Sequence, residues 1–122
     1  MRQIILIDDD PICNYLSEIL IGTISQEIIL KIFTDPIEAL SKLETLTINE
    51  ETMVFLDINM PQMNGFDFLR SFEKTGLKCP FVILTSSSNI IEKENAENNP
   101  LIYKFLTKPL TKEHILDLLE VI

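Results

Sequence analysis

The sequence predicts an α/β fold, a parallel β-sheet covered by helices on both faces. Short apolar runs alternate along the chain with segments whose apolar residues recur at helical spacing. The run at 53–56, MVFL, is continuously apolar, which is typical of a parallel strand buried on both faces. The connections are short, and right-handed crossovers then place helices on both sides of the sheet.

The strand and helix signals alternate from one end of the chain to the other. Strands are predicted from runs of β-branched and large apolar residues at 4–7, 27–33, 53–57, 80–84 and 101–106. Helices are predicted from apolar residues at helical spacing at 11–21, 36–46, 66–74 and 112–122, with a polar and weakly periodic fifth at 89–98. The strand order 2-1-3-4-5 of flavodoxin-like doubly wound folds fits this pattern best.

Capping residues mark most helix ends. Asp10 and Asp35 each precede a proline at the first helical position, and Thr111 precedes the last helix. Gly22 and Gly76 are expected to end the first and third helices. The first helix is expected to carry an apolar face made of Ile12, Leu16, Ile19 and Leu20.

The composition is that of a folded domain with an acidic surface. The chain has 122 residues, 46% of them hydrophobic, and is expected to form one domain over residues 1–122. Its 10 basic and 19 acidic residues give a formal charge of −9, which disfavours nucleic acid and anionic membranes as partners. No apolar stretch is long enough for a signal peptide core or a membrane span, so a cytoplasmic protein is expected.

Polar residues follow several of the predicted strands. Asp8 and Asp9 follow the first strand, and Asp57 ends the third. In the predicted order these two strands are neighbours, so the three carboxylates converge on one crevice at the carboxyl edge of the sheet. Thr85 and Lys108, which end the fourth strand and follow the fifth, reach the same crevice.

Three neighbouring carboxylates repel one another, and a divalent cation relieves that repulsion. The donors are all oxygen atoms, which suits Mg²⁺; neither cysteine has a CxxC partner or a histidine cluster that would favour zinc. A carboxylate flanked by a metal ion, an ammonium and a hydroxyl has what in-line phosphoryl transfer requires. We therefore expect an aspartyl phosphate to form on Asp57.

The chain resembles the receiver domains of two-component response regulators, the CheY-like family. The resemblance lies in four segments in the order and spacing of that family: ILIDDDP at 5–11, LDINMPQMNGFDFL at 56–69, ILTSSS at 83–88 and FLTKPL at 105–110. It covers the whole chain. Each segment alone is weakly specific, but the four together are highly specific.

The resemblance implies a role for each site residue. It implies Asp57 as the phosphoacceptor, Asp8 and Asp9 as the acidic pair of the Mg²⁺ site, and the Asn59 carbonyl as a further metal ligand. It implies that Lys108 and Thr85 bind the phosphoryl oxygens. It implies that Thr85 and Phe105 are the switch residues. It also suggests a cis bond between Lys108 and Pro109.

The implied function is a signalling module rather than an enzyme, with self-phosphotransfer and autodephosphorylation as its chemistry. The implied partners are a sensor histidine kinase or phosphotransfer protein and a downstream protein. The downstream protein would bind the surface of the fourth helix, fifth strand and fifth helix, with the chain a monomer or a weak phosphorylation-dependent dimer. Two alternatives are a phosphorylation-independent interaction domain and an aspartyl-phosphate phosphatase. The phosphatase is disfavoured because position 59 is Asn rather than a second acid.

Overall fold

A computed structural model describes residues 2–86 and 99–122 of the chain. Strands and helices alternate as β1 (Gln3–Ile7), α1 (Pro11–Ile24), β2 (Ile29–Phe33), α2 (Pro36–Leu43), β3 (Thr52–Asp57), α3 (Gly65–Glu73), β4 (Phe81–Thr85), β5 (Ile102–Thr107) and α5 (Lys112–Leu119). The helix predicted at 89–98 lies outside the described residues. Among the described residues, no helix has both the length and the apolar character needed to cross a membrane.

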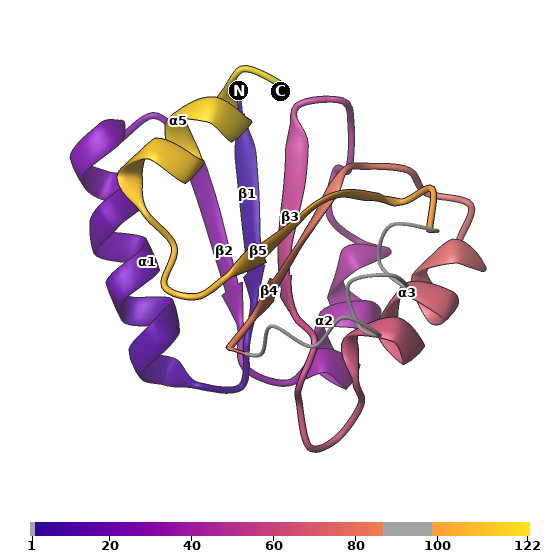
Figure 1. Ribbon diagram of the computed structural model, residues 1–122. Coiled ribbons are helices and arrows are strands. Elements are labelled where there is room, and N and C mark those ends of the chain that lie inside the picture. The colour runs from indigo at the N-terminus through magenta and orange to yellow at the C-terminus, as the bar shows by residue number, and fades with distance from the viewer. Residues whose placement is uncertain (1, 87–98) are drawn as a thin grey trace.

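The five strands form one parallel sheet in the order β2-β1-β3-β4-β5 (Figure 1). This confirms the predicted flavodoxin-like arrangement. The register pairs Ile7 of β1 with Leu56 of β3, and Asp57 with Leu84 of β4. The residues that follow β1 therefore lie beside the end of β3 at the carboxyl edge of the sheet.

Helices cover both faces of the sheet, α1 and α5 on one and α2 and α3 on the other (Figure 1). The α2/α3 face buries alternate strand residues together with Phe68, Leu69 and Phe72 of α3. The α1/α5 face buries the other strand residues together with Ile21 of α1 and Ile115 of α5. Because β1, β3 and β4 lie between these two layers, every one of their residues is buried.

The predicted N-caps are present. The side chains of Asp10, Asp35 and Thr111 each accept a hydrogen bond from a backbone N–H in the first turn of the helix that follows. Most element ends lie close to the predicted ones. Helix α2 ends at Leu43 rather than Leu46, although the Leu46 N–H still donates to the Lys42 carbonyl.

Helix α1 departs from the prediction in two ways. It does not end at Gly22 but continues to Ile24, which packs against the core of the α1/α5 face. The predicted apolar face also points mainly outward, since Ile12, Leu16 and Ile19 are 68%, 60% and 48% exposed. Helical spacing identifies a face but not its direction, and in α1 the inner face carries Ile21 and the polar Asn14.

Two glycines in helices should respond to alanine in opposite directions. A Cβ at Gly65 would lie 2.9 Å from the Ile58 Cα and 3.2 Å from the Asp57 carbonyl oxygen, whereas one at Gly22 meets no atom within 4 Å. Gly65→Ala should therefore destabilise the fold by about 1–3 kcal/mol through overpacking. Gly22→Ala should stabilise it by about 0.5–1 kcal/mol because alanine favours a helix. Urea unfolding of both variants measures this, and equal effects would contradict it.

Candidate phosphoacceptor site

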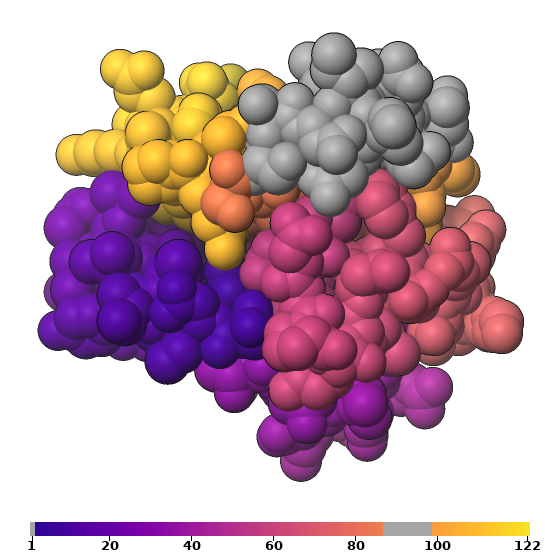
Figure 2. Space-filling view, turned by 60° about the horizontal axis from the view of Figure 1, so that its bottom comes forward, coloured from indigo at the N-terminus to yellow at the C-terminus, as the bar shows by residue number. Residues whose placement is uncertain are grey.

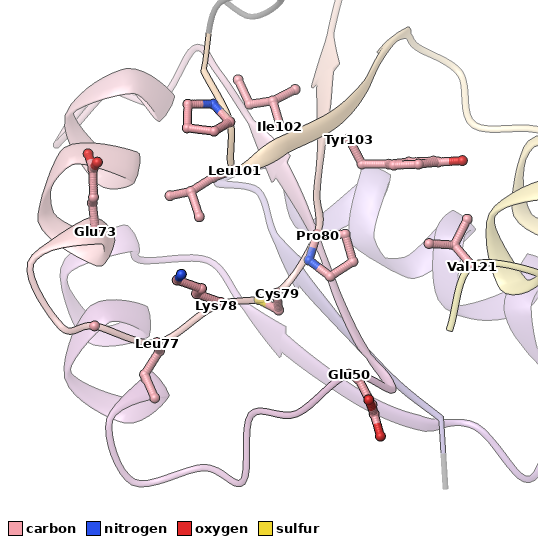
Figure 3. Close-up of a pocket in the computed structure, with 12 residues that line it drawn as sticks. Glu50, Glu73, Leu77, Lys78, Cys79, Pro80, Leu101, Ile102, Tyr103 and Val121 are labelled. Atoms are coloured by element: carbon pink, nitrogen blue, oxygen red, sulfur yellow. The ribbon is translucent and has the colours of Figure 1, made fainter.

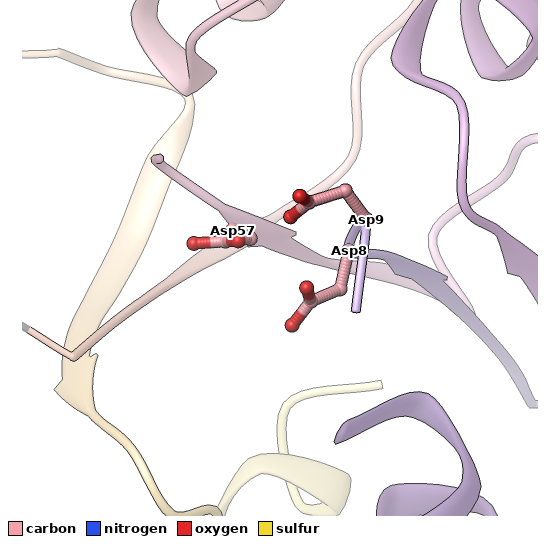
Figure 4. A group of neighbouring side chains, drawn as sticks. All are labelled: Asp8, Asp9 and Asp57. Atoms are coloured by element: carbon pink, nitrogen blue, oxygen red, sulfur yellow. The ribbon is translucent and has the colours of Figure 1, made fainter. Parts of the chain in front are cut away.

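Three carboxylates meet at the carboxyl edge of the sheet. Asp8 and Asp9 follow β1, Asp57 ends β3, and one ligand atom from each lies within 4.8 Å of the others (Figure 4). Figure 2 faces this edge, where the indigo segment after β1 borders the magenta segment after β3 and the yellow segment after β5. The predicted convergence of these three side chains is therefore present in the structure.

The acidic side chains differ in their surroundings. Asp8 and Asp57 are 4% and 5% exposed, and Asp9 is half-buried. Asp8 follows β1 and Asp57 ends β3, and neither strand has an exposed residue, so little water reaches the two carboxylates. Burying an unpaired carboxylate is costly, and each of the two is compensated by specific donors.

Lys108 supplies the positive charge of the site. Its Nζ lies 2.6 Å from Asp8 Oδ2 and 3.6 Å from Asp57 Oδ2. Its backbone N–H donates to the Thr85 carbonyl at 2.7 Å, and the Lys108–Pro109 peptide bond is cis, as predicted. Burial alone would lower the pKa of Lys108, but its hydrogen bond to Asp8 and the charges of Asp8 and Asp57 raise it. The ammonium therefore stays charged at neutral pH.

Asp57 titrates in an unusual range. Burial raises its pKa from 3.8 to about 6, and the charge of Asp8 acts in the same direction. The Asn59 backbone N–H, which donates to Asp57 Oδ1 at 3.1 Å, and the charge of Lys108 oppose this rise. At neutral pH Asp57 is a carboxylate with little solvation, which favours reaction with an electrophile or binding of a cation.

The remaining predicted residues lie around this cluster. The Asn59 side-chain amide donates to Thr85 Oγ1 at 3.4 Å, and the Thr85 side chain is fully buried. Phe105 is half-buried and packs against the core of the α2/α3 face. Sequence reasoning missed Asn14, whose Nδ2 donates to the Asp8 carbonyl oxygen at 2.8 Å. No local sequence pattern marks it, since α1 contains other polar residues as well.

The donor set fits Mg²⁺. Asp8, Asp9 and Asp57 provide hard carboxylate oxygens in one place, without histidine or cysteine ligands. A pocket of about 120 Å³ lies beside them, lined by Asp8, Cys13, Leu16, Lys108 and others.

A larger hollow lies at the opposite edge of the sheet and shares no residue with the carboxylate cluster. It has a volume of about 790 Å³ and lies at the amino ends of β4 and β5, where Cys79, Pro80 and Tyr103 contribute to its walls (Figure 3). Cys79 is buried, which raises the pKa of its thiol to about 12. The volume of a pocket is a poor guide to the functional site here, since the ion pair between Asp8 and Lys108 lines the smaller pocket.

Asp57→Asn should stabilise the fold near neutral pH by about 1–2 kcal/mol when divalent cations are absent. Because the folded-state pKa of about 6 exceeds the ordinary 3.8, the folded protein holds more protons between these values, and its stability falls as pH rises through them. The gain should therefore vanish below pH 3.8. Urea unfolding across this pH range, with a chelator present, measures the effect.

A suitable control is Asp35→Asn, because Asn caps α2 as well as Asp does. It should leave stability unchanged near neutral pH. Destabilisation by Asp57→Asn, or a gain that persists in acid, would contradict the assigned pKa.

Comparison with known proteins points to one family. A family model described as the response regulator receiver domain matches residues 4–120. A protein-glutamate methylesterase/protein-glutamine glutaminase of Treponema denticola is 34% identical over 96 residues, which make up 78% of this chain and 24% of that protein. The chain thus spans about a quarter of the length of that relative.

Solved structures agree with this match. A two-component response regulator from Cytophaga hutchinsonii superimposes with a TM-score of 0.86 at 26% identity, over 98% of this chain and 95% of that one. The receiver domain of a sensor histidine kinase from Pseudomonas aeruginosa shares the fold, with a TM-score of 0.79 at 19% identity over 98% and 94% of the chains. With its parallel sheet in the order 2-1-3-4-5 and its acidic cluster at the carboxyl edge, this chain belongs to the response regulator receiver domain family.

Proposed function

We propose that Asp57 accepts a phosphoryl group from a phosphohistidine on a sensor histidine kinase or phosphotransfer protein. The observation that carries this proposal is the position of its carboxylate, buried beside the acidic pair and 3.6 Å from the Lys108 ammonium. Residues 1–122 would act as one receiver module in the cytoplasm. The net charge of −9 argues against nucleic acid or an anionic membrane as its partner.

In the transfer, an oxygen of Asp57 bonds to phosphorus while the bond between phosphorus and the partner's histidine breaks. The electron pair of that bond returns to the imidazole. Lys108 would stabilise the negative charge on the phosphoryl oxygens, and the Thr85 hydroxyl would donate to one of them. Water later attacks the aspartyl phosphate and releases inorganic phosphate, so the chain's chemistry would be limited to its own phosphorylation and its reversal.

Mg²⁺ would be held by Asp8, Asp9, Asp57 and the backbone carbonyl of Asn59. When bound, it would neutralise charge on the transferred group. The three neighbouring carboxylates support this proposal. So does the Pseudomonas aeruginosa receiver domain of the same fold, which was solved with a magnesium ion coordinated in its active site cleft.

The output would be a change of packing at Thr85 and Phe105. Thr85 would turn from Asn59 toward the phosphoryl group, and Phe105 would move into the space this leaves. This would shift the population between two arrangements of a surface that includes β5 and α5 and that a downstream protein binds. The helix predicted at 89–98, which would be part of that surface, lies outside the described residues. A weak dimer of the phosphorylated chain would be a second readout of the same surface.

Incubation with Mg²⁺ and acetyl phosphate should add one phosphoryl group, at Asp57. Intact mass and peptide mapping would locate it, and Asp57→Asn should remain unlabelled. Continuous release of phosphate without a stable label would indicate a phosphatase instead. If neither label nor turnover is seen, the chain is an interaction domain that works without phosphorylation.

Lys108→Met should slow phosphorylation of Asp57 by about 10²-fold, because one charged donor to the phosphoryl group is lost. Lys104→Met is a matched control, since Lys104 is exposed on β5. The control should label at the rate of the unmodified chain. Equal rates for both variants would contradict the role proposed for Lys108.

A further inference from the structure

Asn14 is an unusual residue for the inner face of α1. It is 4% exposed, and the other buried residue of this helix is Ile21. Burying an amide costs free energy unless it forms hydrogen bonds. Its Nδ2 donates to the backbone carbonyl oxygen of Asp8 at 2.8 Å, so the amide is directed at a residue of the acidic cluster.

Asp8 is held at each of its polar groups. Its backbone N–H donates to the Phe33 carbonyl at 3.1 Å. Its carboxylate accepts from the Asp10 N–H at 2.9 Å and from Lys108 Nζ at 2.6 Å. Its carbonyl accepts from Asn14. A strand, two loops and a helix therefore fix this residue, and Asn14 is the contribution of α1.

The bond from Asn14 controls more than Asp8 alone. A peptide unit is planar, so holding the Asp8 carbonyl also orients the N–H and Cα of Asp9. The carboxylates of Asp8 and Asp9 project from the two ends of this one peptide unit (Figure 4). The direction of both side chains toward Asp57 thus depends on a plane that the Asn14 amide holds.

We propose that Asn14 is a positioning residue for the Asp8/Asp9 pair and sets the affinity of the site for Mg²⁺. This inference rests on the proposed function, because it assumes that the acidic cluster binds the ion. Removing the amide leaves the Asp8 carbonyl buried and unpaired, and the peptide plane then rotates to find another donor. Groups that orient metal ligands in this way typically contribute about 10–100-fold to metal affinity.

The test is a Mg²⁺ titration of the full chain, followed through backbone amide chemical shifts. Asn14→Leu keeps a similar volume and removes the donor, and its dissociation constant for Mg²⁺ should rise about tenfold. Asn14→Ala lacks the same donor without adding bulk and should show the same rise, so it serves if the leucine variant fails to fold. Unchanged Mg²⁺ affinity in a folded variant would overturn the proposal.

Thr52→Val is the matched control. Thr52 is equally buried and accepts a hydrogen bond from the Gln3 side chain at 3.1 Å, but at the amino end of the same strands. The Thr52→Val variant should lose stability while keeping its Mg²⁺ affinity. A loss of Mg²⁺ affinity in this variant similar to that of Asn14→Leu would show that Asn14 acts only through general stability. If the unmodified chain binds no Mg²⁺, the metal part of the proposed function fails together with this inference.

Discussion

The contact between the Lys108 ammonium and the two buried carboxylates is the interaction on which the site depends. Asp8 and Asp57 are almost inaccessible to solvent, and their carboxylates would repel each other strongly without a neighbouring cation. Lys108 follows β5, which in the sheet is separated from β1 by β3 and β4. The ion pair therefore joins chain segments a hundred residues apart, across the carboxyl edge of the sheet.

The sequence predicted the parts of the structure that polarity and spacing control. Asp57 follows a continuous apolar run, and Asp8 follows another, so each was expected at a strand end. Strands of a parallel sheet end at the same edge, which is enough to predict that the acidic residues and Lys108 lie close together. The N-caps Asp10 and Asp35 were also predicted from local sequence, because a short polar side chain before a proline is typical of a helix start.

The features that sequence reasoning missed depend on the direction in which side chains point in three dimensions. Helix α1 has apolar residues on nearly all sides, so the spacing of Ile12, Leu16 and Ile19 did not reveal that they face outward. Gly22 had a plausible role as a stop signal, but packing of Ile24 extends the helix past it. The role of Asn14 follows from its neighbour in space, and no local pattern marks a side chain that reaches back to a carbonyl before the helix.

The two ends of the described chain lie together at the amino edge of the sheet (Figure 1). The Arg2 side chain donates to the Ile122 carbonyl at 3.2 Å, next to the start of β1 and beyond the end of α5. The acidic cluster lies at the opposite edge. Any protein fused to either terminus would therefore be attached at the edge of the sheet opposite Asp57. Access to the Asp57 carboxylate would stay open.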